Sequence, residues 1–231
     1  MNVRTWMTVV GCSAFATPLM AQIGHEPRSS PYIDLEYKQE ATFFGGYYIA
    51  ATDRAGVAPK DGPMVGLRYD LRLGGPASLA MKFGYVASHR NVIDPRRPEA
   101  TRVVQANASW PVYMADVGVS INLTGQRSYR RIVPFLNGGL GIAWDWKDPD
   151  VGAWKFGIPF AFSAGGGIKY VPSGQLQARV DVFTQFYQIK YPSSYYQIAS
   201  DLTSVLGQDE NNSDWTGNLG LSIGLSYVFF R

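Results

Sequence analysis

The feature that most constrains the fold is an alternation of apolar and polar side chains with a period of two residues. It is clearest in 65–73 and recurs along most of the chain. In 65–73 the apolar positions are Val65, Leu67, Tyr69, Leu71 and Leu73, and the intervening ones are Gly66, Arg68, Asp70 and Arg72. Successive side chains of a β-strand point to opposite faces. The segment is therefore predicted to be a strand with one apolar face and one charged face.

Eight segments show this pattern, at about 33–50, 65–73, 79–85, 113–123, 136–142, 156–170, 176–186 and 219–229. Several of them reach the roughly 9–11 residues that a tilted strand needs to cross a bilayer. Short connections at 74–76, 124–131 and 172–174 alternate with long ones at 51–62, 89–111, 145–154 and 190–214. Outer-membrane barrels have short periplasmic turns and longer extracellular loops. The pattern predicts an all-β, eight-stranded antiparallel up-and-down transmembrane β-barrel.

The bulk of the apolar face decides between a membrane barrel and a soluble one. An eight-stranded lumen is just wide enough to be filled by side chains. The apolar faces of all eight segments carry large side chains such as Phe, Tyr, Leu and Ile, so we expect them to face outward. A soluble, lipocalin-like carrier with its apolar face inward remains the structural alternative.

The N-terminus predicts export. Arg4 precedes a short apolar stretch, and Pro18-Leu19-Met20-Ala21 resembles a cleavage site. We expect a signal peptide at 1–21, a short periplasmic segment at 22–31 and the barrel at 32–231. Val9-Val10-Gly11-Cys12 leaves open a lipoprotein interpretation. Cys12 is the only cysteine, so cleavage after Ala21 leaves no disulfide.

Charged residues on the polar faces are predicted to form an ion-pair network in the lumen, because buried charges are costly unless paired. The network members are Glu36, Lys38, Glu40, Arg68, Asp70, Arg72, Lys82, Asp116, Lys169, Arg179 and Asp181. The first strand is expected to bring Glu36 or Glu40 near Arg68 or Arg72. Such a network would plug the barrel with a polar filling.

Aromatic residues near the strand ends predict interfacial girdles, where amphipathic rings sit at headgroup level. The predicted girdle residues are Trp110, Trp144, Trp146, Trp154, Trp215, Tyr170, Tyr227 and Phe229. The long connection at 89–111 carries a basic cluster that we expect to contact lipopolysaccharide phosphates, formed by Arg90, Arg96, Arg97 and Arg102.

Three stretches give the chain a family likeness: Pro134–Gly141, Gly165–Tyr170 and the closing Gly224–Phe229. Through them the chain resembles the small outer-membrane β-barrel proteins of Gram-negative bacteria, in the OmpA/OmpX-like group. The resemblance implies an outer-membrane location in a Gram-negative-type bacterium and insertion by the barrel-assembly machinery. It also implies contact with outer-membrane lipid and lipopolysaccharide, and a monomer.

The residues favour a structural or surface-contact role over chemistry. The chain has two histidines, and His89 beside Ser88 is the candidate for a lipid A-modifying enzyme. Adjacent residues of a strand point to opposite faces, so no catalytic residue is expected. The spacing of Asp145, Asp148 and Asp150 matches no full calcium loop, and no metal or cofactor is expected either. The net charge of +3 gives no reason to expect a nucleic-acid partner. The alternative function is a narrow channel for ions or small apolar solutes.

Overall fold

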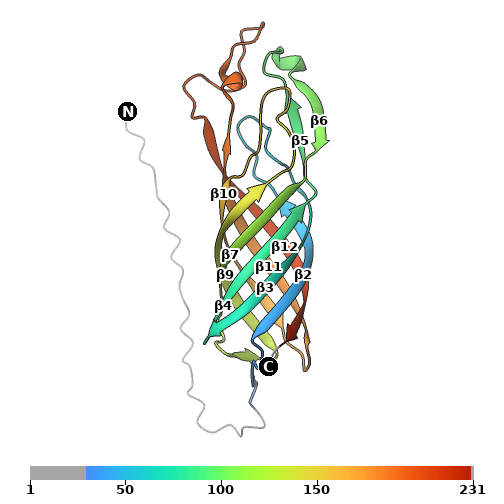
Figure 1. The fold of residues 1–231 in the computed structure, drawn as a ribbon, viewed down its shortest axis with the longest axis vertical. Helices are drawn as coiled ribbons and strands as arrows, with labels where there is room; N and C mark the ends of the chain where they lie inside the picture. Colours follow the sequence, from blue (N-terminus) through green and yellow to red (C-terminus); the bar gives the residue numbers. More distant parts are fainter. Residues whose placement is uncertain (1–29, 230–231) are drawn as a thin grey trace, which may run out of the picture. The chain divides into compact units, whose positions relative to one another are not determined.

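In this computed structural model the described residues are 30–229, so the expected signal peptide and nearly all of the segment at 22–31 lie outside them. Eight long antiparallel strands form the wall of the barrel (Figure 1). Their bounds are β2 (Gln39–Ile49), β3 (Gly62–Gly74), β4 (Ala77–Val86), β7 (Val112–Asn122), β9 (Ile132–Trp144), β10 (Phe160–Tyr170), β11 (Leu176–Lys190) and β12 (Ser213–Phe229).

The last strand closes the barrel by pairing with the first. β12 and β2 are in register from Leu219 opposite Ile49 to Phe229 opposite Gln39. Each of the other wall strands also pairs with a neighbour on both sides. Closure matters because an unpaired backbone N–H or C=O costs several kcal/mol in hydrocarbon. The expected eight-stranded antiparallel barrel is confirmed.

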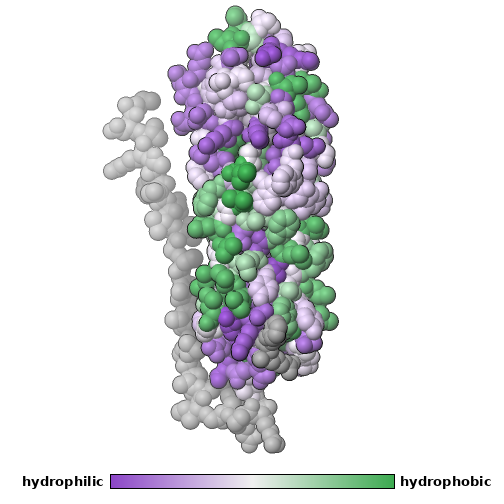
Figure 2. Space-filling model, in the orientation of Figure 1, coloured by the Kyte–Doolittle hydropathy of each residue, from purple (hydrophilic) through white to green (hydrophobic). Residues whose placement is uncertain are grey.

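The two faces of the wall have opposite character, as the alternation predicts. Phe43 is 61% exposed and Ile223 is 69% exposed on the outside, whereas Thr42 and Ser222 are buried on the inside. In Figure 2 hydrophobic side chains cover the middle of the visible barrel wall, and hydrophilic ones gather above and below them. Within residues 30–229 no helix is long and apolar enough to cross a bilayer.

Three phenylalanines point into the lumen, which the sequence-based description as a polar interior did not anticipate. Each lies opposite a glycine of the neighbouring strand: Phe44 opposite Gly66, Phe135 opposite Gly167 and Phe183 opposite Gly220. A Cβ at any of these glycines would lie within 3 Å of a phenylalanine ring atom. Glycine therefore makes the room that lets large rings fill a narrow barrel.

Two predicted strand boundaries are wrong. The segment at 33–50 divides into β1 (Tyr32–Asp34) and β2, and β1 pairs with β8 (Arg127–Tyr129) rather than continuing the wall. The segment at 156–170 becomes a strand only at Phe160. Gly157 just before it has a φ of +73°, and a left-handed residue interrupts a strand.

The long connections fold into an extracellular head above the wall. It contains the hairpin of β5 (His89–Ile93) and β6 (Val103–Ser109), together with the short helices η2 (Glu99–Thr101) and η3 (Ser193–Tyr196). One cluster of buried apolar side chains runs from the upper lumen into the head; its larger members are Phe44, Tyr48, Met64, Phe183, Tyr187, Trp110, Trp154, Phe156, Tyr191 and Tyr195. Barrel and head therefore share one core.

Candidate functional site

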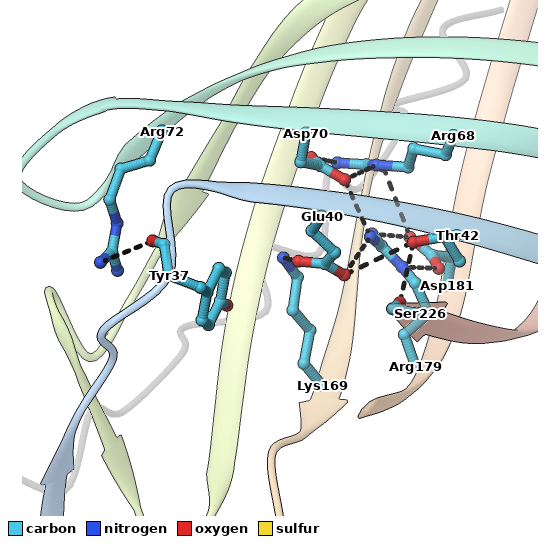
Figure 3. Close-up of polar contacts among 10 residues, drawn as sticks. All are labelled: Tyr37, Glu40, Thr42, Arg68, Asp70, Arg72, Lys169, Arg179, Asp181 and Ser226. Atoms are coloured by element: carbon cyan, nitrogen blue, oxygen red, sulfur yellow. Dashed lines mark hydrogen bonds and ion pairs between the residues drawn. The ribbon is translucent and has the colours of Figure 1, made fainter. Parts of the chain in front are cut away.

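Charged side chains from four wall strands meet in the lumen toward the end with the short turns, which is the periplasmic end in outer-membrane barrels (Figure 3). All are buried: Glu40, Arg68, Asp70, Lys169, Arg179 and Asp181. They lie on β2, β3, β10 and β11, so residues far apart in sequence converge because the wall is closed. We call these six residues the lumen cluster.

Arg179 is the centre of the lumen cluster. Its Nε and one terminal nitrogen donate to the two carboxylate oxygens of Asp181, both at 2.8 Å. The other terminal nitrogen lies 3.2 Å from Asp70 and 3.4 Å from Glu40. The guanidinium also stacks 4.7 Å from the ring centroid of Phe135. Arginine suits this position because its planar fork can hold a carboxylate in bidentate fashion and still reach others.

The remaining cations complete the pairing. Arg68 donates two hydrogen bonds of 2.8 Å to Asp70 and lies 3.7 Å from Asp181. Lys169 donates to Glu40 over 2.7 Å. Three cations thus face three carboxylates with no excess of either sign, which is the condition for burying them without a large cost.

Lys82 and Asp116 lie higher in the lumen and are not joined by a salt bridge among the described residues. They face each other across β4 and β7. The Lys82 ammonium lies 3.0 Å from the centroid of Phe183 and 5.6 Å from that of Phe44. The cation is therefore held against aromatic faces. The cavity beside it has a volume of about 20 Å³, enough for about one water molecule.

Glu36 and Lys38 are not lumen residues, and their predicted place in the ion-pair network is wrong. Both are exposed. The reason is that residues 35–38 cross the mouth of the barrel: β1 is held at the turn between β7 and β9, four strands round the wall from β2. Leu35, at the start of this segment, is buried.

Arg72 holds this crossing segment instead of joining the lumen cluster. One of its terminal nitrogens donates to the carbonyl of Leu35 over 2.6 Å, and its guanidinium lies 5.4 Å from the ring centroid of Tyr37. Figure 3 shows the contact of the same nitrogen with the carbonyl of Tyr37, at 3.5 Å. The backbone N–H of Arg72 also donates to the carbonyl of Lys38. A charge predicted for the interior of the barrel thus closes its periplasmic end.

Arg90 is the corresponding buried cation of the head, and its predicted contact with lipopolysaccharide is wrong. The side chain is fully buried, with its guanidinium between Trp110 and Trp154 at 4.0 and 4.2 Å from their centroids. It forms an ion pair with Asp150. Trp110 and Trp154 are buried for the same reason, so they are not part of the interfacial girdle.

Arg102 is also turned inward, where it joins two loops. It donates to the carbonyl of Ser204 over 3.1 Å and to the hydroxyl of Thr203 over 2.6 Å. Beside this junction, hydrogen bonds from the Thr203 hydroxyl and the Glu99 backbone lower the pKa of Asp201 to about 2. Of the predicted basic cluster only Arg96 and Arg97 are exposed, and Arg97 pairs with Asp94 at 3.3 Å.

The other predicted girdle residues lie at the two ends of the outer wall. Trp146 and Trp215 are exposed, Trp144 is half-buried, and the Trp144 ring stacks 5.8 Å from that of Tyr113. At the periplasmic end Tyr170 and Tyr227 are exposed and Phe229 is half-buried, with the Tyr227 and Phe229 rings 6.3 Å apart. Three of the five tryptophans predicted for the girdle are thus at least partly exposed at strand ends.

His89 and Ser88 do not form a nucleophile and base. Ser88 is buried, and its hydroxyl donates to the carbonyl of Lys60 over 2.6 Å, whereas His89 is exposed. No group of three or more His, Cys, Asp or Glu suited to a metal ion occurs within residues 30–229.

A closed wall with an apolar exterior and a charged interior defines the fold as that of a small outer-membrane β-barrel. No family model matches the sequence, and no match was found among curated proteins. Among solved structures the chain is similar to Neisserial surface protein A (11% identity, TM-score 0.52, covering 83% of this chain and 97% of that one). It is also similar to the outer membrane protein OprG from Pseudomonas aeruginosa (11% identity, TM-score 0.48, covering 85% and 98%). The expected likeness to small outer-membrane barrels is confirmed for the fold.

Replacing Arg179 by Met should lower the free energy of unfolding by about 3–5 kcal/mol, the usual cost of removing one partner from a buried ion pair. The measurement is urea unfolding of the lipid-embedded barrel, followed by tryptophan fluorescence. The matched control is the double variant Arg179→Met/Asp181→Leu, which removes both partners and should recover part of the loss. A loss below about 1 kcal/mol for the single variant would show that the lumen cluster does not stabilise the barrel.

Replacing Arg90 by Met should loosen the head and leave the wall intact, because Arg90 holds Trp110, Trp154 and Asp150 together. We expect faster proteolytic cleavage of the loops, with unchanged mobility of the unboiled protein on a gel. The control is Arg96→Met, which removes an exposed arginine from the same loop and should leave the cleavage rate unchanged. Equal cleavage rates for Arg90→Met and the wild type would contradict the role assigned to Arg90.

Proposed function

We propose that the protein is a non-catalytic outer-membrane barrel whose plugged lumen supports a rigid extracellular head, and that the head makes contacts at the cell surface. The observation that carries this proposal is the single apolar core shared by barrel and head. Loops fixed in this way on a rigid scaffold are the usual carriers of binding function. The proposal treats the protein as a monomer inserted by the barrel-assembly machinery.

The side chains that fill the lumen support the proposal that it is plugged. The lumen cluster joins β2 and β3 to β10 and β11 across the interior. Phe135 packs against the lumen cluster, and Phe44, Phe183 and the crossing segment occupy other levels of the same interior. An ion would have to break paired charges to pass, because the cavity between them measures about 20 Å³. A selective pore would more naturally show an excess of one charge sign than this balance.

Apolar side chains at the tip of the head support the proposal that the head makes surface contacts. Leu202 is 86% exposed and Ile198 is 58% exposed in the last long loop. This loop is docked on the hairpin of β5 and β6 by Arg102, and Val103 is half exposed beside that junction. Exposed apolar groups that are held in place in this way are typical of interaction sites.

The plugged lumen predicts that the purified protein gives no steady conductance in planar lipid bilayers at neutral pH. The positive control is Arg68→Ala/Arg179→Ala, which removes two of the three cations and leaves the carboxylates of Glu40, Asp70 and Asp181. This variant should open a small conductance that prefers cations. Steady single-channel currents from the wild type would instead favour the narrow channel.

The surface-contact role predicts that Ile198→Ser/Leu202→Ser reduces attachment and aggregation of cells that display the protein, because the tip loses its apolar side chains. The control is Leu73→Ser, which removes an exposed leucine at the periplasmic end and should have no effect. Amounts of folded protein are compared by heat-modifiable mobility. Wild-type attachment and aggregation by the double variant would overturn the proposed contact surface.

A further inference from the structure

The wall of the barrel is uneven at its extracellular rim beside β10. β10 begins at Phe160, and its pairing with β11 ends with Ala161 opposite Tyr187. β11 and β12 continue upward and pair as far as Lys190 opposite Ser213. This difference in length leaves an outward groove of about 560 Å³ between the chain that leads into β10 and the projecting end of β11.

The lining of this rim groove changes character along its height. Its main residues are Lys155, Ile158, Phe160, Gln188, Lys190 and Trp215. Ile158 is 71% exposed and Phe160 is 54% exposed, so an apolar surface faces outward at the top of the wall. Lys155 and Lys190 come from the two chain segments that continue beyond this apolar level into the head. The groove therefore has cations on its solvent side and an apolar floor on its membrane side.

Trp215 fixes the level of the rim groove relative to the membrane. Its exposed ring lies 5.6 Å from that of Phe162 on the outer wall. Trp144 ends β9, the neighbour of β10 on the other side. Tryptophan rings in this position mark the boundary between hydrocarbon and headgroups. The groove thus opens sideways at the headgroup level of the outer leaflet.

Within residues 30–229 neither of the two lysines is held in an ion pair, although Lys155 lies close enough to Asp145 for its charge to act on that carboxylate. Both lysines are exposed, and neither forms a salt bridge or side-chain hydrogen bond in the part of the chain that the structure describes. Two carboxylates near the rim are already engaged: Asp214 pairs with Arg54, and Asp145 accepts a hydrogen bond from Trp110. Two cations above an apolar floor are complementary to a lipid whose headgroup carries phosphate.

We propose that the rim groove binds the phosphorylated lipid A part of lipopolysaccharide, with a phosphate between Lys155 and Lys190 and an acyl chain along Ile158 and Phe160. The proposal rests on the outer-membrane placement in the proposed function. It moves lipopolysaccharide contact from Arg90 and Arg102, which are buried, to two lysines that the sequence analysis did not single out. Lysine stems can also lie on the apolar floor while their ammonium groups reach the headgroup.

The test measures binding of bisphosphorylated lipid A to the folded protein in detergent micelles by native mass spectrometry. Lys155→Gln/Lys190→Gln should weaken binding about tenfold, the scale expected when charge-assisted hydrogen bonds are lost. The matched control, Arg96→Gln/Arg97→Gln, removes the same charge from another loop and should change binding less than about twofold. Both double variants are checked for folding by the mobility of unboiled protein.

A dephosphorylated lipid A provides the second comparison. It should bind the wild type no better than bisphosphorylated lipid A binds Lys155→Gln/Lys190→Gln. Equal binding by the wild type and the lysine variant would overturn the proposal, as would an equal loss in the arginine control. Phosphatidylglycerol that binds as tightly as lipid A, with the same loss in the lysine variant, would assign the groove to a phospholipid and overturn the proposed occupant. None of these results depends on the conductance or attachment measurements, so the rim groove and the proposed function can fail separately.

Discussion

Backbone hydrogen bonding inside hydrocarbon is the constraint on which the rest of this structure depends. An open sheet edge is not tolerated there, and the pairing of β12 with β2 removes the last edge. Closure with eight strands then fixes a lumen that side chains must fill. Three groups together fill it: Arg179 with the carboxylates around it, the phenylalanines that lie opposite glycines, and the crossing segment. The interior is thus a consequence of strand number, and functional contacts are left to the rim and the head.

The fold could be predicted from sequence because its signal is repeated in every wall strand. Once the strands are placed, the alternation of side chains along each strand (its parity) is enough to decide that Glu40, Arg68 and Arg179 face inward. By the same alternation, Phe44, Phe135 and Phe183 also face inward. Each lies opposite a glycine of the neighbouring strand, a signal that can be recognised only when the register of the two strands is known. The polar faces are dominated by small and charged residues, so composition alone does not indicate the three rings among them.

Parity fails where the chain leaves the wall, and the wrong predictions lie there. Tyr32 to Lys38 alternates like a strand, but β1 pairs with the turn opposite β2, so Glu36 and Lys38 never enter the lumen. Trp110 and Trp154 sit near strand ends, where sequence cannot tell a lipid-facing ring from one that packs on a buried arginine. The partner that decides this, Arg90, comes from a different loop than Trp154 and Asp150, and only the folded head brings them together.

Two of the buried arginines, Arg179 and Arg90, illustrate how one residue type serves two environments. Arg179 lies among carboxylates in the lumen and uses its hydrogen-bonding fork, with one aromatic ring beneath it. Arg90 has one carboxylate and two tryptophan rings, so stacking supplies much of what replaces its hydration. Lysine, with a compact and strongly hydrated charge, suits neither position as well. The lumen nevertheless holds two lysines, Lys169 paired with Glu40 and Lys82 against the ring of Phe183. Lys155 and Lys190 lie at the exposed rim, where a charge can stay hydrated until an anionic partner arrives. Burial and pairing, rather than the choice between arginine and lysine, thus separate the cations that hold the structure together from the two that remain available at the rim groove.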